Sequence, residues 1–426
     1  MQIIGIDLGT TSICGVVVDS KTGVVLKSKT VSSEAFIDSP NAFEKIQSPE
    51  KIISLATEIL DGFITEETAA IGVTGQMHGI VYTDIHGNAV SPLYTWQDKR
   101  GNELYQDTTY AKYLGSNTGY GNVTDFYNKV NGIRPESAVG YSTIHDYLVM
   151  KLCGLKKAKI HISDAASFGL FNLEGKAFDY DCDLDVVDNY TVAGVYKNIP
   201  VSVAIGDNQA SVFSTLAGDD AVLLNVGTGS QVSAINDKII VSENLETRPY
   251  FDGKYLIVGA ALCGGRAFAV LKDFYKALLN TVCKTDDGKV YKIMDEMLEK
   301  TTSSPLKVDT RFSGTRANEG ILGSITGISA DNLTPENLTF GVIEGMVDEL
   351  YGLYKEMNIN KKLLFGSGNG LRKNKPFIKL SEDKFGAELK IPAHKEEAAF
   401  GAALFGAIAA GVFKDSKEAQ ELIRYE

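Results

Sequence analysis

The chain of 426 residues has few cysteines and no closely spaced pair of them. The cysteines are odd in number and show no C-x-x-C spacing, which argues against a disulfide framework and against a zinc site of the usual kind. They are Cys14, Cys153, Cys182, Cys263 and Cys283. We therefore expect a protein of the reducing cytoplasm.

Positive charge is outnumbered, since 42 Lys and Arg against 54 Asp and Glu give a formal net charge of -12. A basic face is what nucleic acid and anionic membranes require, so neither is expected as a partner. The apolar stretch 398–413 is too short to span a bilayer, and we expect no signal peptide, because residues 1–6 show no basic n-region or cleavage site. The five histidines are dispersed and suggest no metal cluster. An anionic ligand must then be held by backbone amides, helix N-termini or a metal ion.

Two common nucleotide signatures are missing. The chain contains neither G-x-x-x-x-G-K-[ST] nor G-x-G-x-x-G. Their absence disfavours a Walker-type or a dinucleotide-binding domain.

The order of apolar runs and turns predicts α/β alternation in two similar halves. Residues 3–30 read as a three-stranded meander, and Ser48-Pro49 should begin a helix that precedes a short strand at 69–73. Residues 222–235 repeat the first hairpin, with a Gly-Thr turn between apolar strands. Further on, Thr334-Pro335 should begin a long helix that runs to about Met357. We expect two domains, at residues 1–200 and 201–426.

The first hairpin turn is a candidate phosphate site. Glycine lets a phosphate approach the backbone, hydroxyl groups can bind its oxygens, and Asp7 can hold Mg²⁺. The turn residues are Gly9, Thr10, Thr11 and Ser12. The alternative is an ordinary hairpin turn with a hydrogen-bonded aspartate.

A second turn of this kind, Gly227-Thr228-Gly229-Ser230, lies about half the chain later. Two such turns in equivalent domains would grip a phosphate chain from both sides of a cleft. The glycine cluster 366–370 follows an apolar strand and suits close approach of adenine or ribose, although a strand-to-helix connection explains it equally well.

Asp207 is the candidate general base. It ends an apolar run and begins a helix that we expect to continue to about Leu216. A carboxylate here could accept a proton from a sugar hydroxyl as the bond to phosphorus forms. A simple helix cap is the alternative.

Two further segments combine aromatic and hydrogen-bonding side chains, as a sugar site requires. One contains Gln76, Met77 and His78, and the other contains Trp96 and Asp98. A structural histidine and a core tryptophan are the competing interpretations.

With these residues in place, the chain resembles the FGGY carbohydrate kinases of the actin-like, ribonuclease-H-like ATPase superfamily. Residues 7–12 and 227–230 resemble the two phosphate motifs of the family, 365–374 its adenosine motif, 206–209 its catalytic-base segment and 397–403 its terminal helix. The resemblance implies an α/β fold of two ribonuclease-H-like (actin-like ATPase) domains flanking a central cleft.

The same resemblance implies ATP and Mg²⁺ as cofactors and assigns site residues. Asp207 is the implied base, Asp7 the metal residue, and Gln76, Met77, His78, Trp96, Asp98 and Asp207 the sugar contacts. The residues implied for nucleotide binding are Gly9, Thr10, Thr11, Ser12, Gly227, Thr228, Gly229, Gly264, Gly265, Gly366, Ser367, Gly368, Asn369 and Asn374.

The segment 76–79 resembles the sugar-contact segment of the ketose kinases. A finer resemblance, to the sedoheptulokinase subgroup, lies in the segments 95–98, 143–147, 164–169, 250–251 and 259–265. A ketose is therefore the expected substrate, with sedoheptulose first and xylulose second. A non-catalytic sugar sensor on the same fold is the alternative from another class. The chain leaves open whether the protein forms a homodimer.

Overall fold

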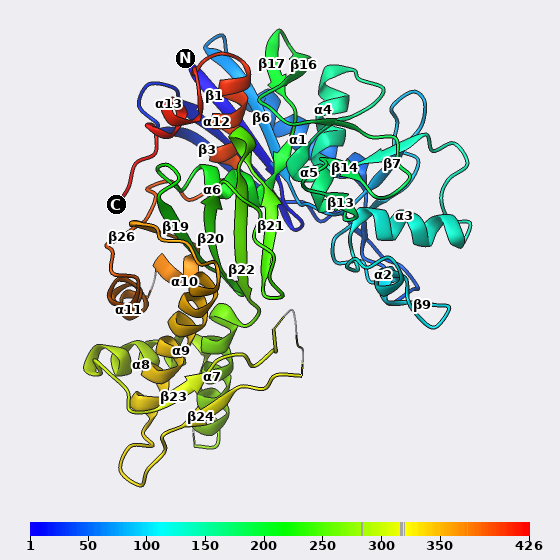
Figure 1. Ribbon diagram of the computed structural model, residues 1–426. Coiled ribbons are helices and arrows are strands. Elements are labelled where there is room, and N and C mark those ends of the chain that lie inside the picture. The colour runs from blue at the N-terminus through cyan, green and yellow to red at the C-terminus, as the bar shows by residue number, and fades with distance from the viewer. Residues whose placement is uncertain (283, 316–317, 319, 373) are drawn as a thin grey trace. The chain divides into compact units, whose positions relative to one another are not determined.

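The computed structural model describes residues 1–282, 284–315, 318, 320–372 and 374–426 (Figure 1). Cys283 lies outside the described residues, as does Lys373 within the expected adenosine segment. The chain forms two compact units. The first comprises Met1–Ala217, Arg248–Gly253 and Ala393–Arg424, and the second comprises Gly218–Thr247, Lys254–Pro392 and Tyr425–Glu426.

A mixed sheet forms the centre of the first unit, in the order β16-β17-β6-β1-β2-β3, with β18 also paired to β6. β1 and β2 are antiparallel, as are β2 and β3, so the expected meander is confirmed. β6 runs parallel to β1, and β18 parallel to β6. Their bounds are β1 Gln2–Leu8, β2 Ser12–Asp19, β3 Val25–Ser32, β6 Thr68–Gly75, β16 Val192–Tyr196, β17 Ile199–Ser202 and β18 Ile205–Gly206.

Helices α1 (Pro49–Phe63) and α12 (Glu397–Ala409) cover opposite faces of this sheet. A Cβ on Gly5 would meet Ala399 of α12, whereas a Cβ on Gly15, the partner of Ile6, would meet Ile59 of α1. Successive side chains in a strand point to opposite faces of the sheet. Helix α12 therefore lies on the face of Gly5, and α1 lies on the face of Ile6. The expected helix start at Ser48 is confirmed, since its side chain accepts a hydrogen bond from the backbone of Lys51.

The rest of the first unit consists of short elements, several of which lie beside the sheet (Figure 1). Its helices are α2 Tyr110–Tyr113, α3 Gly121–Val130, α4 Ile144–Cys153, α5 Ile162–Ser167, α6 Asp207–Phe213, α13 Ser416–Gln420 and the 3-10 turns Arg100–Asn102 and Phe251–Gly253. Its short strands are β4 Phe36–Ile37, β5 Ile46–Gln47, β7 Val81–Thr83, β8 Leu93–Tyr94, β9 Leu104–Tyr105, β10 Thr108–Thr109, β11 Gly140–Ser142, β12 Lys159–His161, β13 Phe171–Asn172, β14 Ala177–Phe178 and β15 Asp185–Val187.

The second unit is built on a sheet of order β21-β22-β20-β19-β25-β26. Here β19 and β20 are antiparallel, β20 and β22 are antiparallel, and β19 is parallel to β25. In the first sheet, β6, β1, β2 and β3 run in the same relative directions as β25, β19, β20 and β22 do here. The expected repeat of the hairpin is therefore confirmed. The bounds are β19 Ala221–Val226, β20 Ser230–Asn236, β21 Leu245–Pro249, β22 Tyr255–Ala261, β25 Leu363–Ser367 and β26 Leu389–Lys390.

One apolar core joins this second sheet to its helices, and α9 supplies many of the buried side chains, among them Phe340, Ile343 and Leu350. Thr334 and Pro335 begin α9 as the sequence predicts. The remaining bounds are α7 Gly264–Leu279, α8 Asp287–Lys300, α9 Pro335–Glu356, α10 Asn369–Arg372, α11 Lys375–Phe385, β23 Lys307–Asp309 and β24 Ser324–Thr326.

The compact units do not coincide with the sequence ranges expected for the two domains. Residues 201–217 and 393–424 pack with the first unit, because α6 and α12 lie against its sheet. Compactness does not locate the boundary of a sequence repeat, so the division at residue 200 stays a prediction. Over the ranges that the structure describes, we find no helix long and apolar enough to cross a membrane.

Candidate active site

The ends of three neighbouring strands of the first unit, β1, β6 and β18, bring together the candidate metal, sugar-binding and base residues. Asp7 in β1 pairs with Thr74 in β6, and Gly206 in β18 pairs with Gly75 at the end of β6. The strands are parallel, so the residues that follow them meet at one edge of the sheet. Asp7, the segment after Gly75 and Asp207 therefore lie at this edge.

Asp207 begins helix α6 and is anchored through the residues before it. The Thr74 hydroxyl donates to the carbonyl of Ile205 at 2.7 Å, and the backbone N–H of Gly206 donates to Ser163 Oγ at 3.1 Å. Helix α6 ends at Phe213, earlier than the expected Leu216, although the Leu216 N–H still donates to the Val212 carbonyl at 3.0 Å. The bonds from Thr74 and to Ser163 therefore hold the two residues that precede Asp207.

Burial raises the pKa of the Asp207 carboxyl from 3.8 to about 6. Two nearby positive groups, His145 and Arg248, act in the opposite direction and hold the pKa down, whereas Asp164 raises it. Such a carboxylate is ionised near neutral pH and still accepts a proton more readily than an exposed aspartate. Arg248 escaped the sequence analysis, because it is distant in sequence and belongs to no motif recognised there.

The pKa of Asp7 is raised further, to about 7, chiefly by burial and then by the negative charge of Asp207. Its Oδ1 atom is buried and has no hydrogen-bond partner. A buried carboxylate oxygen without a donor, beside a second carboxylate, is suited to a cation. The residues at this position therefore fit a divalent metal ion.

The first turn is connected directly to two expected sugar contacts. Trp96 donates from Nε1 to Thr10 Oγ1 at 2.9 Å, and the Thr10 hydroxyl donates to Gln76 Oε1 at 3.3 Å. Gln76 in turn donates to Gln47 Oε1 at 2.9 Å, and Gln47 donates to the Thr10 carbonyl at 2.7 Å. The candidate phosphate turn and the candidate sugar residues thus form one hydrogen-bonded network.

Met77 and His78 lie beside the start of α6. A Cβ on Gly206 would meet the Met77 thioether at 2.7–2.8 Å, so Met77 packs against the residue that precedes Asp207. His78 has a positive φ of 72°, a conformation that costs a non-glycine residue about 1–3 kcal/mol. Its ring stacks on Tyr120 with the centroids 4.4 Å apart, and its Nδ1 donates to the Ser167 carbonyl at 2.7 Å. These contacts hold His78 in its strained conformation.

Trp96 and Asp98 differ sharply in exposure. Trp96 is 47% exposed, so its ring is available to a ligand, whereas Asp98 is fully buried. The Asp98 carboxylate accepts hydrogen bonds from Arg100 at 2.7 and 3.1 Å and from the Lys45 N–H at 3.0 Å. Direct contact between Asp98 and a sugar, which stays a prediction, would require some of these bonds to be exchanged.

The sequence did not indicate a buried cluster whose charges act on Asp207. His145, Asp146 and Asp164 each place one potential ligand atom within 4.8 Å of the others. His145 Nε2 and Asp164 Oδ1 form an ion pair at 3.0 Å, although not with the angle of a hydrogen bond. The residues lie in two helices, α4 and α5, and only the packing of these helices brings them together.

In the second unit, the turn Gly227–Gly229 is exposed and the start of α7 packs against it. A Cβ on Gly264 would meet the backbone of Gly229 at 2.3 Å, and a Cβ on Gly265 would meet the Gly227 carbonyl at 2.3 Å. The N–H of Gly265 donates to Gly227 at 3.1 Å. Both glycines are thus required for close contact with the turn.

The glycine cluster after β25 reaches the same turn. Gly368 has a φ of +89°, and a Cβ there would meet the Val226 carbonyl at 2.4 Å. Gly366 and Ser367 end β25, Asn369 begins α10, and Asn374 caps α11 by accepting from the Phe377 N–H at 3.0 Å. Three of the expected nucleotide segments therefore meet around residues 226–230 of the second unit.

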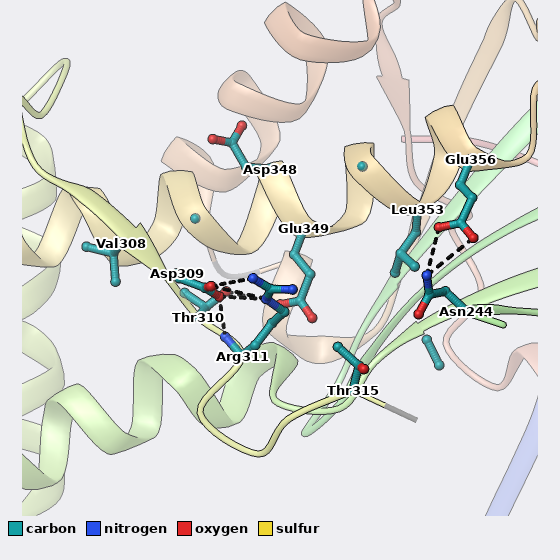
Figure 2. Close-up of a pocket in the computed structure, with 13 residues that line it drawn as sticks. Asn244, Val308, Asp309, Thr310, Arg311, Thr315, Asp348, Glu349, Leu353 and Glu356 are labelled. Carbon is teal, nitrogen blue, oxygen red and sulfur yellow. Dashed lines mark hydrogen bonds and ion pairs between the residues drawn. The ribbon is translucent and has the colours of Figure 1, made fainter. Parts of the chain in front are cut away.

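A cavity of about 360 Å³ in the second unit contains none of the expected site residues (Figure 2). Its charged groups are engaged locally: Arg311 donates to Asp309 at 2.6 Å, and Thr310 donates to Glu349 at 3.1 Å. Asn244 likewise donates to Glu356 at 3.1 Å. The cavity gives no reason to revise the candidate site.

Known proteins resemble this chain over nearly its whole length. A mouse (Mus musculus) sedoheptulokinase is 28% identical over 94% of this chain and 96% of its own. The solved xylulose kinase from Rhodospirillum rubrum has a TM-score of 0.85 at 18% identity and covers 100% of this chain and 93% of that one. Plasmodium falciparum glycerol kinase with ADP has a TM-score of 0.80 at 18% identity, with coverage of 100% and 93%.

These solved structures share the two-domain actin-like, ribonuclease-H-like fold. Sequence profiles of the FGGY family of carbohydrate kinases match residues 2–188 for the N-terminal domain and residues 222–410 for the C-terminal domain. The chain therefore belongs to the FGGY family of carbohydrate kinases, which are ATP-dependent sugar kinases.

Proposed function

We propose that this kinase transfers the terminal phosphoryl group of ATP to the terminal primary hydroxyl of a ketose, with sedoheptulose as the first choice. The product would be sedoheptulose 7-phosphate. The similarity to mouse sedoheptulokinase, which extends over nearly the whole of both chains, supports this substrate. The segment Gln76-Met77-His78 supports it too, because the glycerol-specific members are expected to have an Arg-Glu pair here.

The observation that carries the proposal is the meeting of Asp7, Met77 and Asp207 at adjacent strand ends. In this arrangement Asp207 accepts the proton of the attacking hydroxyl, since its carboxylate is ionised at neutral pH and has a raised proton affinity. Phosphoryl transfer requires little covalent chemistry from the protein, so the residues that orient the hydroxyl matter as much as the base.

Asp7 would hold Mg²⁺, directly or through water, because its Oδ1 is buried and unpaired. The bound ion would neutralise charge on the phosphate oxygens. The phosphates themselves would contact Thr10, Thr11, Thr228 and Gly229. Gly366 to Asn369 and Asn374 would lie near the adenosine, where glycines allow the nucleotide to approach the backbone.

The ketose would stack against Trp96, whose exposed ring is fixed by its hydrogen bond to Thr10. His78 and Gln76 would bind hydroxyl groups. The bond of His78 Nδ1 to the Ser167 carbonyl orients the ring that would bind a sugar hydroxyl. Asp98 would either orient the site through its bonds to Arg100 or exchange one of these bonds for a bond to a sugar hydroxyl.

A cytoplasmic location and a homodimer stay predictions of the sequence.

A coupled assay of ADP release tests the substrate. Sedoheptulose, xylulose, ribulose and glycerol would be compared as acceptors at equal concentrations, with an ATP-only reaction as the blank. We expect the highest kcat/KM for sedoheptulose. A preference for xylulose would replace the proposed substrate and keep the ketose class, whereas ketose binding without turnover would favour a sensor.

A further inference from the structure

Helix α5 is bonded both to the turn that carries the candidate base and to the loop that carries the candidate sugar contacts. Ser163, in its first turn, accepts the backbone N–H of Gly206 at 3.1 Å, and Gly206 directly precedes Asp207. Ser167, its last residue, accepts the backbone N–H of His78 at 3.1 Å. One short helix therefore contacts two parts of the candidate site that are distant in sequence.

The two serines are well placed to act together. They are four residues apart in α5, so they lie on the same face of the helix. Both are buried, with Ser163 1% exposed and Ser167 5% exposed. A buried hydrogen bond is not exchanged readily for one to water, so each serine can hold its partner in place.

Each serine hydroxyl directs its own proton back into α5 or its cap. Ser167 Oγ donates to the carbonyl of Asp164 at 2.7 Å. Ser163 Oγ lies 2.9 Å from Nδ1 of His161, which also accepts the Ser163 N–H at 3.2 Å. Because this Nδ1 accepts an N–H, it carries no proton, and the Ser163 hydroxyl must be the donor to it. Both oxygens therefore present lone pairs to N–H groups outside the helix.

The helix itself is firmly seated. Its cap residue His161 is 1% exposed, and the imidazole packs on Phe405 of α12 and on Phe251, with ring centroids 5.4 and 5.7 Å apart. Ile162 and Ala165 of α5 are buried as well. The two serines are thus carried by an element whose position is fixed by the core of the first unit.

Ser167 holds a residue whose backbone is strained. His78 has a φ of 72°, which a residue with a side chain rarely adopts. The Ser167 hydroxyl accepts the His78 N–H, and the Ser167 carbonyl accepts from Nδ1 of its ring at 2.7 Å. Ser167 thus fixes both the backbone and the ring of the candidate sugar contact.

The sugar loop and the base turn also touch directly. A Cβ on Gly206 would lie 2.7–2.8 Å from the thioether of Met77, the residue before His78. The contacts therefore form a closed ring from His78 through α5 and Gly206 to Met77. Such a ring leaves little freedom for the separation of His78 and Asp207.

We propose that α5 is a positioning element of the reaction, in which Ser163 and Ser167 fix Asp207 relative to His78. This inference rests on the proposed function, in which Asp207 is the base and His78 contacts the sugar. Phosphoryl transfer depends on the orientation of the attacking hydroxyl, and a displacement of about 1 Å can cost about a hundredfold in rate. Loss of either serine bond should therefore impair the reaction, although neither serine is expected to touch the substrate.

Two substitutions remove one bond each. For Ser163→Ala and Ser167→Ala, kcat and KM would be measured with ATP and with sedoheptulose, or with whichever ketose has the highest kcat/KM in the acceptor panel. We expect S163A to lower kcat about tenfold with the sugar KM little changed, because the base turn is loosened. S167A should raise the sugar KM about tenfold, because His78 is loosened. The KM for ATP should stay unchanged in both.

The double variant S163A/S167A tests whether the serines act through one element. Both bonds restrict the same separation, so the second loss should cost less than the first. The fall in kcat/KM should then be smaller than the product of the two single losses. A fall equal to that product would show two independent bonds and would overturn the proposal, as would unaltered sugar kinetics in both folded single variants.

Ser381 in α11 provides the matched control for the loss of a buried hydroxyl. It is fully buried, and its hydroxyl donates to the Phe377 carbonyl of its own helix at 2.8 Å. Ser381→Ala should leave kcat and the sugar KM unchanged. Kinetic losses in S381A as large as those in S163A and S167A would show a general softening of the protein and would overturn the proposal.

Cysteine variants keep the test decisive if an alanine variant does not fold. Ser163→Cys and Ser167→Cys nearly preserve the volume of the side chain and replace a strong acceptor by a weak one. Each should change the same kinetic constant in the same direction as the alanine variant. Unaltered constants in the folded cysteine variant would overturn the proposal for that serine.

Two further variants separate this proposal from the proposed function. Asp207→Asn must lose turnover and His78→Ala must raise the sugar KM. If either fails to do so, the base or the sugar contact in the proposed function is wrong, whatever the serine variants do. If both behave as expected while folded S163A and S167A retain the kinetics of the unmodified enzyme, only the role of α5 is refuted.

Discussion

Asp207 is the residue on which the proposed chemistry depends most directly. Asp207→Asn preserves the size of the side chain and removes its ability to take a proton. We expect kcat to fall by about 10²–10⁴-fold, the usual contribution of a general base, while ATP still binds. Initial rates and ATP titrations measure the two effects separately. A rate close to that of the unmodified enzyme would reduce Asp207 to the first residue of α6.

The raised pKa of Asp207 predicts how activity depends on pH. The base must be ionised, and its pKa of about 6 lies above the ordinary 3.8 because of burial, opposed by His145 and Arg248. Activity should therefore be complete above about pH 7 and should fall tenfold per unit below about pH 6. A profile of kcat/KM at saturating ATP tests this. Full activity down to about pH 4.5 would contradict it.

At the scale of elements, α12 supports the helix that carries Asp207. Gly401 of α12 lies so close to α6 that a Cβ would be 1.9 Å from the Ala210 carbonyl. Gly401→Ala should therefore destabilise the protein by about 1–3 kcal/mol and disturb α6, with a loss of kcat. Thermal unfolding and initial rates provide the measurements.

Gly62 of α1 is the matched control, because it also lies in a helix and a Cβ there would meet nothing within 4 Å. Gly62→Ala should stabilise the protein by about 0.5–1 kcal/mol through helix propensity alone. Equal Tm values for the two variants would show that close packing of α12 is unimportant.

For the whole molecule, the packing of α12 predicts that the N-terminal half does not fold by itself. Helix α12 covers β1 and β6 through Gly5 and Gly72, so a fragment of residues 1–200 would expose one face of its sheet. We expect this fragment to aggregate or to unfold without a cooperative transition. Circular dichroism during heating measures the transition.

A rearranged chain provides the control. Arg424 donates to the Thr22 carbonyl at 2.7 Å, and the Ser20 N–H donates to Met1, so the two ends of the first unit lie close together. Residues 393–426 joined by a short Gly-Ser linker to residues 1–217 should therefore unfold cooperatively. Cooperative unfolding of residues 1–200 alone would contradict the importance of α12.

Local signals in the sequence were sufficient to predict several helices and strands and to recognise the candidate motifs. The alternation of residues 3–30, the Ser48-Pro49 cap, the Thr334-Pro335 cap and the repeated Gly-Thr turn depend on neighbouring residues, so they could be recognised without knowing the fold. The order of these motifs along the chain then indicated the family.

Contacts between distant parts of the chain were decided only in three dimensions. The fully buried state of Asp98, the ion pair of His145 with Asp164 and the place of Arg248 near Asp207 depend on which helices and strands pack together. The proton affinity of Asp207 is also decided by the tertiary structure, because it depends on burial and on charges that folding brings close. Asp207 could therefore be predicted as the candidate base from the sequence, whereas the groups that set its charge state could not.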